Sequence, residues 1–177
     1  MFTRVYFRIY LNTKYEKGTE MAQEIEKKFL VKEGTNIDSL GKAIEITQGY
    51  LSSVKERTVR IRIKGDKGFL TIKGIGNASG ASRYEFEKEI TIEETKELLA
   101  ICEEPILSKT RTNVAVGKHI FEVDRFLLDN DGLIVAEVEL SDENEEFEKP
   151  EWLGEEVTGD VKYYNSMLLK NPYKNWK

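Results

Sequence analysis

The chain has 177 residues, of which 33% are charged and 40% hydrophobic, and its formal net charge is −5 at pH 7. This length suits one domain with a sizeable core, and the acidic balance argues against a general nucleic-acid binder while leaving room for a local basic pocket. Cys102 and His119 are the only cysteine and histidine, which excludes an intrachain disulfide and a histidine-cluster metal site, so any metal would be a hard cation such as Mg²⁺, Mn²⁺ or Ca²⁺ held by oxygen ligands.

Residues 1–20 precede a second methionine, Met21. Their first half alternates like a short strand, and two arginines interrupt any signal-peptide core. Two interpretations stay open: an additional edge strand, or an upstream mis-start that leaves 21–177 as the single domain. Mass spectrometry of the protein from its own host decides between them, because an intact N-terminus at Met1 rules out the mis-start.

A charged strand is predicted at 24–31. Side chains two residues apart share a face of a strand, so Glu24, Glu26 and Lys28 point the same way. Two carboxylates and an ammonium in this arrangement can hold a divalent cation with an anion beside it. A solvated strand face has the same pattern, so its meaning depends on whether the charged alternation recurs downstream.

Seven further strands are predicted, mostly in hairpins, at 43–53, 57–64, 69–75, 83–90, 107–116, 119–127 and 133–141. The period changes in 91–102, where a capping box at Thr91 and Glu94 and an apolar stripe predict a helix closed by Pro105. A short helix is also predicted at 163–170. Antiparallel strands at this spacing indicate a mainly β fold, either a barrel or a sandwich.

Nearly every predicted strand carries charged side chains at two-residue spacing on one face. In a sandwich these faces would lie outside and the apolar faces would form the core. Repeated R-x-R, K-x-R and E-x-E pairs favour a wide barrel with a charged interior, where guanidinium groups clamp phosphate oxygens and carboxylates hold Mg²⁺ or Mn²⁺. The basic set is Lys28, Arg60, Arg62, Lys73, Lys109 and Arg111, and the acidic set is Glu24, Glu26, Glu85, Glu87, Glu122, Asp124, Glu137 and Glu139.

Several short motifs together resemble the CYTH superfamily, also called triphosphate tunnel metalloenzymes. Residues 24–30 read EIEKKFL and resemble the family signature. The supporting motifs are QGYL at 48–51, VRIR at 59–62, LTIK at 70–73, RYEFE at 83–87, KTR at 109–111, AEVEL at 136–140 and EVTGD at 156–160. This resemblance, closest to the short bacterial inorganic triphosphatases, implies a closed eight-stranded antiparallel β-barrel with an inserted helix and a C-terminal helix.

The resemblance also implies roles for the charged faces. A divalent metal would be held by Glu24, Glu26, Glu137 and Glu139, with Asp124 as an additional ligand or water-holder. The hydroxyl of Tyr50 would hydrogen-bond Lys28, and this pair would set the geometry for attack by water. The side chains expected to contact phosphate are Lys28, Arg60, Arg62, Lys73, Lys109 and Arg111.

Four further residues have less defined roles. For Glu85 and Glu87 three roles stay open: binding a second metal, supporting the basic side chains, or structure alone. Glu122 is grouped with them as a supporting residue. Lys162 stands where the family motif has an arginine, which keeps the charge but loses the bidentate fork for its expected phosphate contact.

The implied function is Mg²⁺- or Mn²⁺-dependent hydrolysis of inorganic triphosphate or a similar short triphosphate. The alternatives are an adenylate cyclase, for which the sequence gives no adenine-pocket signal, a nucleoside or thiamine triphosphatase, and a polyphosphate-binding module without catalysis. A small-molecule triphosphate is the expected partner, without nucleic acid or membrane, and a homodimer stays open. The leading hypothesis places the protein in the cytoplasm. No apolar run is long enough to span a membrane.

Overall fold

The computed structural model describes residues 23–54, 56–76 and 82–176, and at the strand ends beside the gaps, including Glu24, only the backbone is described. The extension at 1–20 lies outside the described residues. The described part forms a nine-stranded sheet, two α-helices and four short 3-10 turns. The strands are β1 (Gln23–Val31), β2 (Ala43–Ser52), β3 (Arg57–Lys64), β4 (Lys67–Gly76), β5 (Ser82–Ile90), β6 (Glu103–Val116), β7 (His119–Phe126), β8 (Ile134–Glu139) and β9 (Leu153–Glu156); the helices are α2 (Ile92–Leu99) and α3 (Asn165–Lys170).

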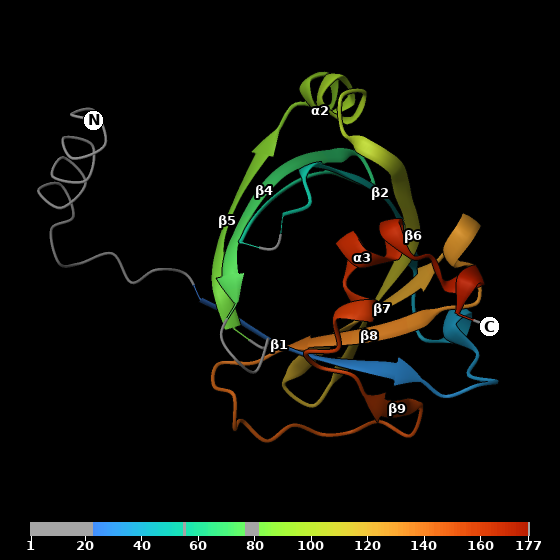
Figure 1. Cartoon of the computed structure of the whole chain (residues 1–177). Helices are drawn as coiled ribbons and strands as arrows, with labels where there is room; N and C mark the ends of the chain where they lie inside the picture. The colour runs from blue at the N-terminus through green and yellow to red at the C-terminus, as the bar shows by residue number, and fades with distance from the viewer. Residues whose placement is uncertain (1–22, 55, 77–81, 177) are drawn as a thin grey trace, which may run out of the picture.

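The strands follow the order β5-β4-β3-β2-β6-β7-β8-β1-β9. Every neighbouring pair is antiparallel, as the hairpin signals in the sequence predict. β1 also pairs with β5, with Ile25 opposite Ser82. Figure 1 shows the sheet curving around a central space, with α2 on its outer side. The prediction of a mainly antiparallel β fold with two helices is therefore confirmed.

One end of the inner sheet face is apolar, and α3 packs against it. Leu168 of α3 is fully buried there, beside Leu107 of β6, Phe126 of β7 and Val135 of β8. Charged residues occupy the same face farther along these strands, at the two-residue spacing of a pleated strand. The C-terminal helix therefore covers the apolar end and leaves the charged part for a pocket.

The outer face of β1, β7 and β8 holds a second apolar core. Phe29, Phe121 and Val138 are buried there beneath the segment that connects β8 to β9, to which Leu140 belongs, and beneath Leu153 of β9. Burial on this face explains the alternation read from the sequence: apolar side chains face the outer core and charged ones face inward. On the outer face of β4 and β5, the side chains of Ile72, Tyr84 and Phe86 stay partly exposed.

Helix α2 covers another part of the outer face. Its N-terminus carries the predicted capping box, in which the Thr91 hydroxyl accepts from the Glu94 amide and the Glu94 carboxylate accepts from the Thr91 amide. The helix sits close to β4 at Gly68, where a Cβ atom would lie 1.8 Å from the Thr95 hydroxyl oxygen. Thr95 is fully buried, so this contact leaves no space for a larger residue.

We therefore expect Gly68→Ala to lower the free energy of unfolding by about 1–3 kcal/mol, the usual cost of overpacking a buried contact. The pocket lies on the opposite sheet face, so ligand binding by the folded fraction should not change. Urea denaturation followed by circular dichroism measures the effect. A midpoint equal to that of the unchanged protein would contradict this close packing of α2.

The structure corrects two predicted helix bounds, the start of β6 and the number of strands. The helix predicted to reach Cys102 ends at Leu99, because the chain turns there and β6 begins at Glu103, ahead of Pro105. The C-terminal helix begins at Asn165 after a separate 3-10 turn at Val161–Tyr163. Eight strands were expected, and β9 is a ninth that pairs with β1. None of the described helices has the length and apolarity to cross a membrane.

Candidate active site

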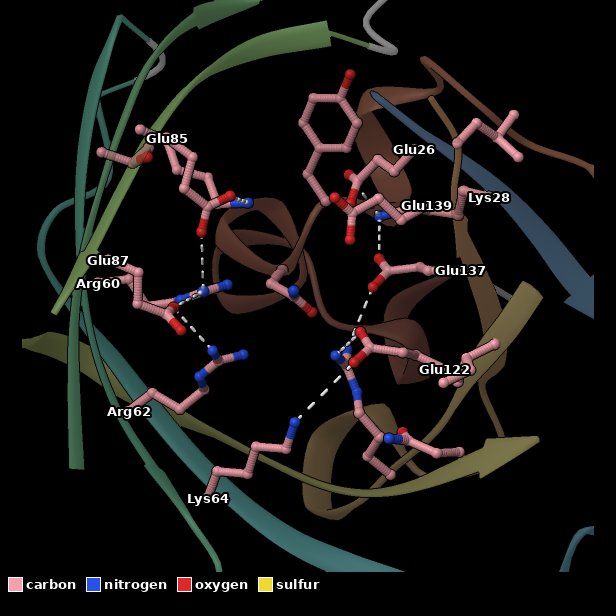
Figure 2. A pocket seen from close by; sticks show the side chains of 18 of the residues that line it. Glu26, Lys28, Arg60, Arg62, Lys64, Glu85, Glu87, Glu122, Glu137 and Glu139 are labelled. Atoms are coloured by element: carbon pink, nitrogen blue, oxygen red, sulfur yellow. Dashed lines mark hydrogen bonds and ion pairs between the residues drawn. The ribbon is translucent and has the colours of Figure 1, made fainter. Parts of the chain in front are cut away.

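The charged inner face lines a pocket of about 750 Å³. Figure 2 shows its two opposing walls: Glu85, Glu87, Arg60 and Arg62 on one side, and Glu26, Lys28, Glu137 and Glu139 on the other. The first wall comes from β3, β4 and β5, and the second from β1, β6, β7 and β8. Predicted site residues that line the pocket are Glu26, Lys28, Tyr50, Arg60, Arg62, Lys73, Glu85, Glu87, Arg111, Glu122, Glu137 and Glu139.

On the second wall, Lys28 is paired with Glu137, its register partner across β1 and β8. The Lys28 Nζ atom lies 2.5 Å from Glu137 Oε1 and 4.0 Å from Glu26 Oε1. Arg111 Nη2 donates to the other oxygen of Glu137 at 3.2 Å. Burial alone would raise the pKa of Glu137, but the charges of Lys28 and Arg111 outweigh it and hold that pKa well below its usual range. Glu137 is therefore a carboxylate that fixes two cations at the pocket wall.

Beneath this wall lies a fully buried ion cluster. Asp124 and Lys109 are each 1% exposed, and they contact each other through Asp124 Oδ2 and Lys109 Nζ. Arg111 Nε donates to Asp124 Oδ1 at 2.6 Å, and Arg111 also contacts Glu122. Burial lowers the pKa of Lys109 to about 8. Neither Lys109 nor Asp124 lines the pocket, so in this structure they support Arg111 from below.

On the first wall, two glutamates of β5 hold three cations. Glu87 Oε2 accepts from Arg62 Nη2 at 2.9 Å and lies 3.4 Å from Arg60 Nη2. Glu85 lies 2.5 Å from Lys73 Nζ and 3.8 Å from Arg60 Nη2. Of the three roles considered for Glu85 and Glu87, these contacts favour support of the basic side chains.

Two donors on this wall have no acceptor among the described residues. The Nε atoms of Arg60 and Arg62 are buried and have no hydrogen-bond partner within the part of the chain that the structure describes. Burial and the nearby charge of Arg60 lower the pKa of Arg62 to about 10. A buried N–H group without an acceptor is costly. Oxygens of a bound anion would supply acceptors to both guanidinium groups.

The CYTH domain family model matches residues 22–166 of this chain. The chain belongs to the CYTH family. It is 49% identical over 158 residues to a protein of Acetivibrio thermocellus named inorganic triphosphatase, which covers 89% of this chain and 99% of that protein. A protein of the same name from Nitrosomonas europaea is 36% identical over 149 residues, covering 82% of this chain and 95% of that protein.

A crystal structure of the inorganic triphosphatase NE1496 resembles this CYTH domain with a TM-score of 0.59 and 33% identity. The alignment covers 82% of this chain and 93% of that one. Both kinds of comparison therefore extend over most of the chain and most of each relative. The family resemblance read from the motifs is confirmed.

The metal donors expected in this CYTH domain are carboxylates, the ligand type that Mg²⁺ and Mn²⁺ prefer. Glu26 and Glu139 are register partners on β1 and β8, and both line the pocket. Among the described side chains, no three His, Cys, Asp or Glu residues gather closely enough to hold a metal by themselves. The donor set nevertheless fits Mg²⁺, because this ion is usually bound by one or two carboxylates together with substrate phosphates and water.

The family resemblance predicts a bond from Tyr50 to Lys28 and a phosphate contact for Lys162. Tyr50 lines the pocket, and its hydroxyl accepts from Gln48 Nε2 at 3.3 Å; its predicted bond to Lys28 stays a prediction. Lys162 does not line the pocket: its Nζ atom lies 3.6 Å from Asp160 and 5.4 Å from the centre of the Trp176 ring. Its phosphate contact also stays a prediction.

Several other residues that line the pocket of this CYTH domain were not among the site residues predicted from the sequence. Lys64 follows Arg62 by two residues on β3 and lies 4.0 Å from Glu122 on the opposite wall, so its position in the alternation could have identified it. Thr58 on β3 and Asn113 on β6 lie in the same alternation and could have been identified in the same way, whereas nothing local marks the lining residues in turns, at strand ends or at the start of α3. They include Lys118, His119, Ser141, Tyr164, Asn165 and Ser166.

Proposed function

We propose that this CYTH domain hydrolyses inorganic triphosphate to pyrophosphate and phosphate in its charged pocket, with Mg²⁺ or Mn²⁺ as cofactor. The observation that carries the proposal is the pair of arginines on β3, whose buried Nε donors have no acceptor in the described part of the chain. They face Lys28 across the pocket. The two curated relatives named inorganic triphosphatase support the same activity.

We further propose that β1 to β8 form a closed tunnel around this pocket. The pairing of β1 with β5 at three residue pairs supports closure, because these strands otherwise lie at opposite ends of the eight-strand order. A closed wall removes exposed sheet edges and limits access by water. Substrate would then enter at the tunnel end opposite α3.

Charge balance supports the use of a metal. Among the described residues, seven lysine and arginine side chains and six glutamates line the pocket. The protein therefore offers little net charge to a triphosphate, which carries several negative charges at neutral pH. A divalent cation that binds with the substrate would offset this charge. We propose that Glu24, Glu26, Glu137 and Glu139 hold it, with Asp124 supporting Arg111 beneath them.

In the proposed reaction, the oxygen of a water molecule attacks the terminal phosphorus in line with the bond to the bridging oxygen. That bond breaks, pyrophosphate leaves, and the protons of the water end on the phosphate products. Lys28 and Arg111 from one wall, and Arg60, Arg62 and Lys73 from the other, compensate charge on the phosphate oxygens. Tyr50 orients Lys28 for this task. When bound, the divalent cation polarises the phosphoryl oxygens as a Lewis acid.

A substrate panel tests this proposal. Purified protein is assayed for phosphate release from tripolyphosphate, ATP and thiamine triphosphate with Mg²⁺ or Mn²⁺, and for cyclic AMP formation from ATP. We expect tripolyphosphate to give the highest kcat/KM, EDTA to abolish turnover, and no cyclic AMP to form. Tight binding of tripolyphosphate without cleavage would indicate a binding module instead, and cyclic AMP would indicate a cyclase. A cytoplasmic location and a homodimer remain predictions from the sequence.

A further inference from the structure

Thr71 lies between the two arginines of the first wall and their carboxylate. It sits on β4, where its register partners are Arg60 on β3 and Glu87 on β5. Its side chain is on the pocket side of the sheet, next to Phe69 and Lys73 in the alternation, but it is completely buried. It therefore lies beneath the pocket surface.

The Thr71 hydroxyl makes two hydrogen bonds that link the charged groups. It donates to Glu87 Oε2 at 2.7 Å and accepts from Arg60 Nη2 at 3.2 Å. Glu87 Oε2 in turn accepts from Arg62 Nη2 at 2.9 Å. One hydroxyl thus connects both guanidinium groups, directly for Arg60 and through a carboxylate for Arg62.

A threonine suits this position because its branched side chain has few rotamers, whereas arginine has many. A fixed hydroxyl can therefore restrict two flexible side chains. Both guanidinium groups are held at Nη2, and their buried Nε atoms have no partner in the described residues. The bonds at Nη2 therefore set the orientation of both guanidinium groups from the strand beneath them.

We infer that Thr71 is a positioning residue that orients Arg60 and Arg62 toward the phosphate groups of the substrate. The inference rests on the proposed function, since it concerns the same pocket. No role was predicted for Thr71 from the LTIK motif that contains it, because nothing in the alternation distinguishes a positioning hydroxyl from an ordinary strand threonine.

The test uses Thr71→Val, which replaces the hydroxyl by a methyl group, and Thr71→Ser, which keeps the hydroxyl. Loss of hydrogen bonds to charged groups should raise the KM for tripolyphosphate about tenfold in Thr71→Val, with kcat changed less than about threefold. Thr71→Ser should retain a KM near that of the unchanged protein. Thr112→Val is the matched control, because Thr112 is a buried threonine of β6 that does not line the pocket. If Thr71→Val does not fold, Thr71→Ala removes the hydroxyl without adding bulk.

The pH dependence gives a readout that a purely structural role would not move. Burial raises the pKa of Glu87, but the Thr71 hydrogen bond and the charges of Arg62, Arg60 and Lys73 outweigh it and keep that pKa low. Without the hydroxyl, Glu87 should gain a proton at a higher pH and release the arginines earlier as pH falls. We therefore expect KM to rise as pH falls, and we expect this rise to begin at a higher pH in Thr71→Val than in the unchanged protein. In Thr71→Ser the rise should begin at the same pH as in the unchanged protein.

The outcomes separate this inference from the proposed function. A Thr71→Val protein with unchanged KM and unchanged pH profile would overturn the inference, while the activity of the unchanged protein would still support the function. If the unchanged protein binds tripolyphosphate but does not cleave it, the proposed function fails. Calorimetry then decides the inference: about tenfold weaker tripolyphosphate binding in Thr71→Val supports it, and equal binding rejects it.

Discussion

Replacing Lys28 by methionine should lower kcat for tripolyphosphate by about a hundredfold or more, in the range measured when one stabilising donor is removed from an active site. Lys28 is only 6% exposed, and its ammonium lies between Glu137 and Glu26 on the pocket wall. Its loss removes a cation from the phosphate groups and leaves Glu137 with Arg111 as its remaining close cation on that wall. Both effects oppose the build-up of negative charge during cleavage.

The adjacent lysine provides a matched control for this change. Lys27 points to the outer face, where its Nζ atom lies 5.8 Å from the centre of the Phe147 ring. Lys27→Met removes the same charge one residue away, so its kcat should stay within about twofold, as for most surface substitutions. Steady-state kinetics and thermal melts of both variants make the comparison. Equal losses in the two variants would show that net charge, and not the pocket position of Lys28, controls activity.

Replacing Glu26 or Glu139 by glutamine should remove metal-dependent turnover. A catalytic metal contributes several kcal/mol, so each change should cost about a hundredfold or more in kcat. Each substitution removes one negative charge from the glutamate pair that faces across β1 and β8, and it leaves the size of the side chain nearly unchanged. We expect Glu24→Ala, predicted from the sequence signature, to give the same loss without unfolding the protein.

Metal binding itself gives a second readout for these variants. Electron paramagnetic resonance of Mn²⁺ in the presence of tripolyphosphate counts bound ions without requiring turnover. Glu26→Gln and Glu139→Gln should bind Mn²⁺ more weakly, while Glu97→Gln, an exposed change on α2, should bind it as the unchanged protein does. Unaltered Mn²⁺ affinity in the first two variants would exclude these glutamates as ligands.

Charged alternation was enough to predict which strand faces line the pocket. Arg60 and Arg62 on β3, and Glu137 and Glu139 on β8, face inward because their neighbours Ile61 and Val138 are buried on the outer side. A period of two is a local property of the chain, so it can be read from the sequence. The strand bounds of β3 agree with the prediction for the same reason.

The alternation could not predict whether a charged side chain lines the pocket or lies buried beneath it. Lys109 has the same alternation as the lining residues but lies beneath the pocket with Asp124, because β6 and β7 run past the charged layer toward the apolar end. The strand β9 was not predicted because it has only four residues and depends on pairing with β1. In this pairing Leu153 lies opposite Val31, which is about 120 residues earlier in the chain. Such distant contacts leave no local pattern.

The central claim is that triphosphate binds between the two walls of this pocket with a divalent cation at the β1 and β8 carboxylates. Crystals of the Lys28→Met variant, soaked with tripolyphosphate and Mn²⁺, test it most directly, since slow turnover preserves the substrate and Mn²⁺ gives an anomalous signal. We expect phosphate density against Arg60 and Arg62, and an anomalous peak beside Glu26 and Glu139. Phosphate density outside the pocket, or Mn²⁺ held by other residues, would contradict the account.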